Sequence, residues 1–89
     1  MRQRLYVVTE VDISEGSVYV PQVRGIYQTY QAAKDNAVVL LCGRAAQLDI
    51  PEKDVDTTSL RLANDMGTVG YQMGISEVEM GLAPVFMAI

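Results

Sequence analysis

The chain contains no histidine, and its 89 residues include a single cysteine, Cys42. A lone cysteine cannot form a disulfide bond within the chain, which agrees with a reducing compartment such as the cytoplasm. Without a histidine or a cluster of cations to stabilise its thiolate, Cys42 is expected to be a small buried hydrophobic residue and not a nucleophile. These absences argue against cysteine-dependent and histidine-dependent catalysis.

The motifs that usually bind nucleotides or form a serine nucleophile are also missing. Gly67, Gly70 and Gly74 in GTVGYQMG match neither a P-loop nor a dinucleotide fingerprint, because both motifs need a strand before the glycines and a helix after them. No serine lies in a nucleophile-elbow motif. We therefore predict a protein that is not an enzyme and that carries no cofactor.

The acidic residues do not form a recognisable site in the sequence. Glu10 could face Glu77 or Glu79 across a sheet as an acid–base pair, but exposed carboxylates on strands normally serve solubility. The segment 49–56, DIPEKDVD, lacks the glycine and the terminal bidentate acid of a calcium loop. It is predicted to be a solvated connector with one helical turn after Pro51. No metal site is expected.

Positive charge and long apolar runs are scarce. Seven basic residues against eleven acidic ones give a net charge of −4, and no basic face is evident, so nucleic acid is not an expected partner. The longest apolar run is too short to cross a membrane, and the start of the chain has no export signal. We expect one soluble domain over residues 1–89, located in the cytoplasm, with no membrane partner.

One helix is clearly predicted over residues 29–48, TYQAAKDNAVVLLCGRAAQL. Thr29 is a suitable N-cap because its hydroxyl can accept from an amide of the first turn. One broad arc of the helix is apolar and predicted to face the core. It contains Tyr30, Ala33, Ala37, Leu40, Leu41, Ala45 and Leu48.

The opposite side of this helix is also apolar. Val38, Val39 and Cys42 lie in the unbroken run AVVLLC, and a helix that is apolar all round needs a second partner. This partner could be another part of the chain or a second subunit, and the sequence leaves both open. Two further alternatives remain: VVLLC could be a buried strand, and Gly43 could end the helix early.

Strands are predicted on both sides of the helix. Residues 4–11 alternate in a way that indicates a strand covered on both faces, which one helix cannot achieve alone. Residues 18–27 form the returning strand of a hairpin, with Pro21 and Gly25 indicating an edge position, a bulge or a break. Residues 58–66 favour a hairpin slightly over a short helix.

The last third of the chain is predicted to contain a further strand and an apolar tail. Val69, Tyr71, Met73 and Ile75 share one strand face, whereas the later apolar residues fall in the opposite phase, so a bulge or turn is expected near Ser76 and Glu77. Residues 83–89, APVFMAI, must dock on some surface, because an exposed apolar terminus is unfavourable. The predicted interface residues are Val38, Val39, Cys42, Val85, Phe86, Met87 and Ile89.

The order of LYVVTEV, GIYQTYQAAKD and YQMGISEVEM resembles small uncharacterised α+β domains common in bacteriophage and bacterial accessory genes. In those domains a strand is followed by a second strand, an aromatic-x-Thr/Ser helix cap and an alanine-containing helix. Tyr27, Thr29 and Ala33 match this pattern. The resemblance covers about half of the chain, excludes residues 49–67 and the tail, and implies a fold more than an activity.

These observations predict an α+β domain in which an antiparallel sheet of three to five strands packs one main helix on one face. The function expected is that of a non-catalytic small interaction protein, such as a phage or bacterial accessory factor, that acts as a homo-oligomer and binds another protein. The alternative is a small-ligand-binding domain with a pocket between subunits. That pocket would be lined by Tyr6, Tyr27, Tyr71 and Arg24 or Arg61.

Overall fold

The helix α1 spans Tyr30–Gln47 and begins where the sequence predicts. In the computed structural model, which describes residues 3–80, Thr29 has extended backbone angles and its Oγ1 accepts from the amide of Ala32 at 3.1 Å. Because an N-cap hydroxyl satisfies one of the free amides of the first turn, this contact fixes the start of the helix.

The end of α1 is set by the backbone beyond it, not by Gly43, which lies within the helix. Asp49 adopts a left-handed conformation with φ of 55°, and the amide of Ile50 donates to the carbonyl of Ala45 at 2.9 Å. This bond, with the buried contact between Ile50 and Ala45, is characteristic of a Schellman C-cap. The alternatives of an early stop at Gly43 and of a VVLLC strand are therefore wrong.

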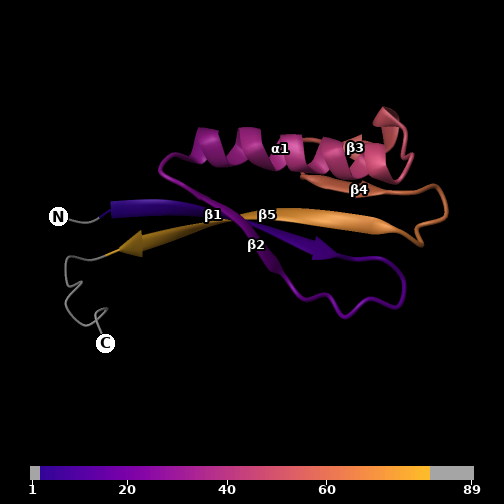
Figure 1. Cartoon of the computed structure of the whole chain (residues 1–89), viewed down its shortest axis with the longest axis horizontal. Coiled ribbons are helices and arrows are strands. Elements are labelled where there is room, and N and C mark those ends of the chain that lie inside the picture. Colours follow the sequence, from indigo (N-terminus) through magenta and orange to yellow (C-terminus); the bar gives the residue numbers. More distant parts are fainter. Residues whose placement is uncertain (1–2, 81–89) are drawn as a thin grey trace.

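The strands form one antiparallel sheet in the order β2-β1-β5-β4-β3, with α1 packed against it (Figure 1). This architecture confirms the predicted α+β class. All neighbouring strands run antiparallel. The strands are β1 (Gln3–Asp12), β2 (Gln22–Tyr27), β3 (Val55–Asp56), β4 (Arg61–Ala63) and β5 (Gly70–Met80).

The centre of the sheet is the long ribbon of β1 and β5. It pairs without a register shift from Gln3 opposite Met80 to Asp12 opposite Tyr71. The bulge predicted near Ser76 and Glu77 is therefore wrong. The apolar pattern changes phase there because the helix-facing side of β5 becomes polar at that end, where Glu77 accepts from the hydroxyl of Tyr6 at 3.3 Å.

The edge strand β2 is shorter than predicted and contains a bulge. It begins at Gln22, and residues 18–20 lie exposed in the loop before it. The pairing with β1 shifts between Val8 and Thr9, which leaves Arg24 as an extra residue. An edge position and an irregularity close to Gly25 agree with the prediction, since proline and an extra residue are tolerated at sheet edges.

The connection between α1 and β5 confirms two smaller predictions. One helical turn, η1 (Glu52–Asp54), follows Pro51 in the connector. β4 and β5 form the hairpin that the sequence slightly favoured over a helix. Asn64 stabilises the turn between them, because its side-chain oxygen accepts from the amides of Thr68 and Val69 at 2.9 and 3.2 Å.

The core lies between α1 and the sheet. Small residues spaced four apart on α1 allow the helix to pack close to the strands, where Leu41, Leu62, Met73 and Val8 are the largest fully buried side chains. The buried row of α1 is narrower than the predicted arc. Tyr30 and Leu48 are partly exposed because they lie at the two ends of the helix, and Leu40 lies on its flank. The buried residues of α1 are Ala33, Ala37, Leu41 and Ala45.

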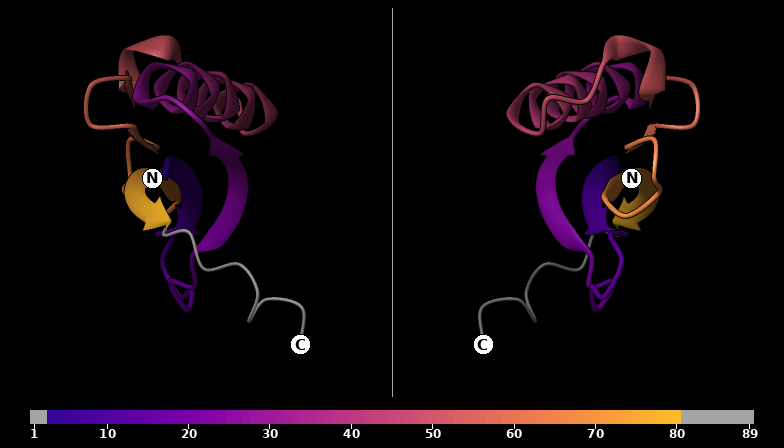
Figure 2. Two further views of the ribbon diagram at one scale, coloured as in Figure 1. Left: turned by 90° about the vertical axis from the view of Figure 1, so that its left-hand side faces the viewer. Right: turned by 90° about the vertical axis from the view of Figure 1, so that its right-hand side faces the viewer.

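The sheet curves around α1, as the end views show (Figure 2). Its concave side carries the core, and its convex face points away from the helix. Within residues 3–80, no second layer covers this convex face.

The α1 helix is not long and apolar enough to span a membrane, and the same holds for every other helix in the described residues.

Candidate functional site

A buried carboxylate lies on the concave side of β1. Glu10 is 5% exposed and lies two residues after the fully buried Val8, on the same face of β1. Burying a carboxylate is costly unless it is paired and hydrogen-bonded. The side chains that pair with Glu10 come from β2 and α1, on either side of it.

Arg44 and Arg24 both bind this carboxylate. Arg44 donates from Nε to Oε2 at 3.1 Å and from Nη2 to Oε1 at 2.8 Å, the two-bond geometry typical of strong arginine–carboxylate pairs. Arg24 donates from Nε to Oε1 at 2.9 Å, and its Nη2 lies 2.8 Å from the same oxygen. Two positive charges thus meet one negative charge.

The local structure explains how these residues meet. The bulge in β2 inserts Arg24 as an extra residue beside β1, and Arg44 lies in the last turn of α1, above the sheet. Neighbouring amide side chains orient both guanidinium groups. Arg24 Nη2 donates to Gln22 at 2.8 Å, and Arg44 Nη1 donates to Gln47 at 3.1 Å.

Tyr71 completes the group from β5. The guanidinium carbon of Arg44 lies 4.6 Å from the centre of the Tyr71 ring, which is cation–π geometry. We refer to Glu10, Arg24, Arg44 and Tyr71 as the Glu10 cluster. It links β1, β2, β5 and α1 through side chains that are mostly or partly shielded from water.

The electrostatics of the Glu10 cluster favour the charged forms of Glu10 and Arg44. Burial by itself raises the pKa of Glu10, but the hydrogen bonds and charges of Arg44 and Arg24 outweigh burial and hold this pKa below its ordinary value of 4.5. The bonds to Glu10 raise the pKa of Arg44. A carboxylate that stays ionised in this way is suited to holding the arginines in place and not to proton transfer near pH 7.

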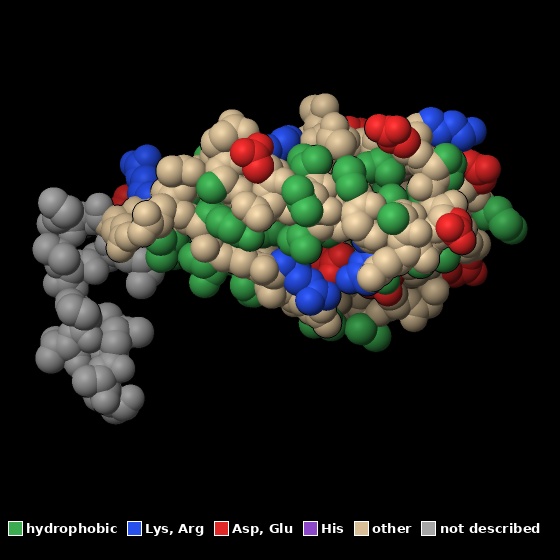
Figure 3. All heavy atoms as spheres, turned by 45° about the horizontal axis from the view of Figure 1, so that its top comes forward, with side chains coloured by type: hydrophobic (Ala, Val, Ile, Leu, Met, Phe, Trp, Pro, Cys, Tyr) green, Lys and Arg blue, Asp and Glu red, His purple; other side chains and the backbone are tan. Residues whose placement is uncertain are grey.

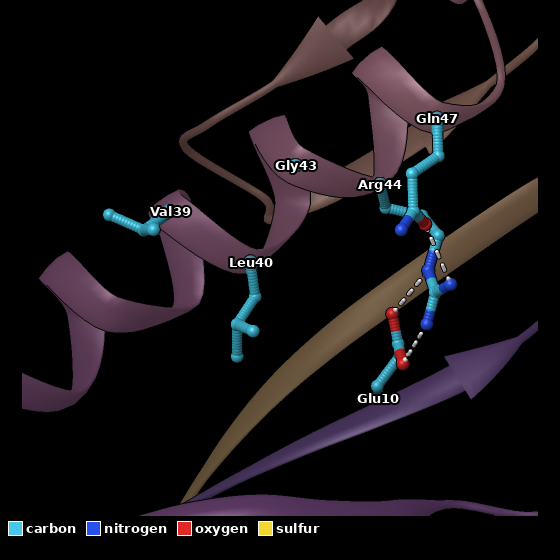
Figure 4. A pocket seen from close by; sticks show the side chains of 6 residues that line it. All are labelled: Glu10, Val39, Leu40, Gly43, Arg44 and Gln47. Atoms are coloured by element: carbon cyan, nitrogen blue, oxygen red, sulfur yellow. Dashed lines mark hydrogen bonds and ion pairs between the residues drawn. The ribbon is translucent and has the colours of Figure 1, made fainter.

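A hollow opens between α1 and the Glu10 cluster (Figure 4). Its volume is about 220 Å³, below the range of about 300–1,000 Å³ that is usual for small-molecule sites. In Figure 4 the side chain of Leu40 points down from the helix towards the strands, whereas that of Val39 points away. The residues that line the hollow are Glu10, Val39, Leu40, Gly43, Arg44 and Gln47.

A second hollow, of about 500 Å³, lies on the other flank of α1, beside the connector to β3. Most of its lining is apolar, and Glu52 is its only charged residue. Cys42 lies on its rim and is exposed, so the expectation of a buried cysteine is wrong. The lining residues are Cys42, Ala45, Ala46, Ile50, Glu52, Val55 and Thr57.

The predicted ligand-pocket residues fall into three places. Arg24 and Tyr71 both belong to the Glu10 cluster. Tyr6 and Tyr27 face each other on β1 and β2 near the start of α1, where the Tyr6 ring makes an edge contact with Tyr30 at 6.0 Å. This pair and Tyr71 lie at opposite ends of the ribbon, because Tyr6 is opposite Glu77 and six residues of β5, about 20 Å, separate Glu77 from Tyr71.

Arg61 lies apart from both groups. It pairs with Gln72 on β5, so its side chain points to the face of the sheet opposite to that of Tyr71.

The acid–base pair of Glu10 with Glu77 or Glu79 that was considered from the sequence is not formed. Glu10 is opposite Met73, while Glu77 forms an ion pair with Arg4 at 3.4 Å.

The predicted interface residues on α1 differ in how exposed their side chains are. Val39 is 68% exposed and Cys42 is exposed, whereas Val38 is partly buried against the core. The remaining predicted interface residues, Val85, Phe86, Met87 and Ile89, lie outside the described residues.

Sequence reasoning missed the importance of Glu10 and Arg44. A signal was present, because Glu10 continues the buried alternation of Tyr6 and Val8, and Arg44 adjoins Ala45 on the core-facing arc. Opposite charges at core-facing positions of two elements indicate an ion pair between them.

Residues 3–80 contain no group of three or more acidic, cysteine or histidine side chains placed to hold a metal ion. Comparisons with known proteins add no function: no protein-family model, no curated protein and no solved structure matches the chain.

Proposed function

We propose that the protein is a non-catalytic interaction protein that acts as a homo-oligomer and binds through the surface between α1 and β2. The observation that carries this proposal is an exposed apolar rim beside two oriented guanidinium groups. Val39 is 68% exposed and Leu40 is 36% exposed, and both line the hollow that Arg44 also lines. Interfaces commonly combine such apolar anchors with arginine.

The charge and shape of this surface suit a protein segment as its ligand. The hollow is too small for a typical metabolite but large enough to accept an apolar side chain of a partner. The excess positive charge beside it attracts an acidic side chain, and a second copy of this chain, with a net charge of −4, offers several. In Figure 3, green side chains form a band along the side of the molecule that bears α1, next to a group of basic and acidic ones.

The test is the solution mass of the full chain, measured by light scattering over a range of concentrations. We expect an oligomer whose dissociation constant rises at least tenfold in Val39→Glu, because the new charge would be buried at the interface. Met66→Glu is the matched control, since Met66 is 82% exposed in a turn away from this surface. A full chain that stays monomeric at all concentrations, or equal weakening by both variants, would refute the proposal.

The alternative function, small-ligand binding, is favoured by the second hollow, whose volume of about 500 Å³ lies within the usual range for small-molecule sites. A ligand from a panel of nucleotides and metabolites would then raise the melting temperature of the full chain. Ala46→Phe should abolish this shift by filling the hollow, whereas Ala46→Ser should preserve it. A panel without any shift argues against this alternative.

The biological setting that we propose is that of a phage or bacterial accessory factor in the cytoplasm. It is supported by the Tyr27-x-Thr29 helix cap and Ala33 of the resemblance, and by the lone cysteine.

A further inference from the structure

The second hollow, beside the connector to β3, combines a buried apolar part with one charged residue in its lining. Ala45 and Ile50 are 5% and 8% exposed, and Val55 packs partly buried beside them. Glu52 and Thr57 are the exposed polar residues of the lining. The volume of about 500 Å³ is sufficient for a small molecule that has an apolar body and one polar group.

The connector that forms one side of this hollow is strongly acidic. Residues 49–56, DIPEKDVD, contain four acids and one lysine, hence a net charge of −3 in a chain whose net charge is −4. Lys34 approaches the connector from α1, where its Nζ donates to the carbonyl of Thr58 at 3.4 Å. Four acids against two lysines still leave an excess of negative charge beside the hollow.

The acids of the connector are not neutralised by ion pairs. Within residues 3–80, no lysine or arginine forms an ion pair with any of the four. Asp54 follows Glu52 by two residues, and its Oδ2 is buried without a hydrogen-bond partner in the part of the chain that the structure describes. A cleft beside charges of one sign concentrates counter-ions, so this hollow should attract a cation.

The end of α1 adds to the negative potential. Ala45 and Ala46 line the hollow and belong to the last turn of α1, where the aligned peptide dipoles place about half a negative charge. The basic residue of that turn, Arg44, binds Glu10 on the opposite flank of the helix. A cation in the hollow would therefore interact favourably with the helix end as well as with the connector.

We propose that the second hollow binds an amphipathic organic cation, an amine whose apolar body contacts Ala45, Ile50 and Val55 while its ammonium group lies beside Glu52. An anion of the same shape is repelled by the connector, and a neutral molecule gains the apolar contacts alone. This inference rests on the second candidate function, small-ligand binding, and names the class of ligand. It does not involve the surface between α1 and β2.

The experiment is a titration of the full chain with three probes that share one apolar body: phenylbutylamine, phenylbutanol and phenylbutyrate. Binding is followed by the amide chemical shifts in nuclear magnetic resonance spectra. We expect the amine to shift the amides of Ala46 and Ile50 and to bind about threefold more tightly than the alcohol, with the acid the weakest of the three. Because salt screens exposed charges, this preference should shrink at about 1 M sodium chloride.

Two substitutions test the charge and the cavity separately. Glu52→Gln should remove most of the preference for the amine and leave the affinity for the alcohol unchanged. Glu52 is exposed, so the substitution should not disturb folding. Glu15→Gln is the matched control, since it makes the same change of charge in the loop after β1 and should alter neither affinity. Ala46→Phe should weaken the binding of all three probes by filling the hollow.

Equal affinities for the amine and the alcohol, or a preference that Glu52→Gln leaves intact, would overturn this inference while small-ligand binding at the hollow stands. Probes that shift no amide of the hollow would also overturn it, and the panel of nucleotides and metabolites would then decide the second candidate function separately. The oligomeric state decides the main proposal independently, because the second hollow lies on the other flank of α1 from the hollow that Val39 lines.

Discussion

Glu10→Gln removes the negative charge of the Glu10 cluster while nearly preserving the shape of the side chain. The two guanidinium groups then face each other across an amide that can accept hydrogen bonds but carries no charge. Arg24 and Arg44 retain contact with water, since their side chains are 37% and 27% exposed. Water can therefore compensate part of the lost interaction.

The size of the effect lies between two limits. Breaking a fully buried ion pair costs about 3–5 kcal/mol, and a single hydrogen bond to a charged group contributes about 1.5–3 kcal/mol. Because the arginines are partly exposed, we expect Glu10→Gln to lower the free energy of unfolding by about 2 kcal/mol at pH 7. With a urea m-value of about 1 kcal/mol/M for a domain of this size, the midpoint should fall by about 2 M.

The pH dependence provides a second check. The arginines hold the pKa of Glu10 below 4.5, so its stabilisation is fully present above the pKa of the unfolded state and is lost as the pH falls through the lower pKa of the folded state. The difference between the wild-type protein and Glu10→Gln should therefore be constant from pH 7 to about 5 and shrink at more acidic pH.

Urea unfolding followed by circular dichroism at a series of pH values measures both effects. Glu15→Gln is the control, since Glu15 is exposed in the loop after β1 and the substitution changes the net charge equally. If Glu10→Gln and Glu15→Gln differ by less than about 0.5 kcal/mol at pH 7, within the range of ordinary surface substitutions, the reasoning about the Glu10 cluster is refuted.

Three further substitutions test the backbone arguments by thermal or urea unfolding. Gly43→Ala should stabilise the protein by about 0.5–1 kcal/mol, because Gly43 is helical and an added methyl group meets no atom within 4 Å; a loss of stability would contradict this. Gly25→Ala should destabilise it by about 1–3 kcal/mol, because the new Cβ would lie 2.5 Å from the hydroxyl of Tyr27, and an unchanged midpoint would show that the ring moves freely. Thr29→Ala should cost about 1 kcal/mol by removing the N-cap bond, while Thr29→Ser should retain most of it.

The helix could be predicted from the sequence because its determinants are local. Thr29 can accept from an amide three residues away, and the small or apolar residues of the buried row, three alanines and Leu41, recur every fourth residue, so neither feature depends on distant parts of the chain. The end of the helix was not predictable to the residue. Asp49 takes the left-handed conformation that glycine usually supplies, and Gly43 was the more obvious stop.

The Glu10 cluster was harder to predict because its residues are brought together by non-local pairing. Glu10 and Tyr71 meet only after β1 pairs with β5, and the position of Arg24 depends on a bulge whose exact place the sequence does not specify. The apparent phase slip near Ser76 had a similar cause, because the alternation rule assumes that one face stays buried along the whole strand. On β5 the face that packs against α1 is buried along only part of the strand.

The order of the strands also has a consequence for synthesis. The central pair of the sheet joins the first described strand to the last, so β1 has only the edge strand β2 as a neighbour until β5 has left the ribosome. Contacts between distant parts of a chain slow folding, and an unpaired edge can associate with other chains. A nascent chain stalled before residue 70 would therefore present β1 with one side open, and we expect it to need a chaperone that the finished protein does not.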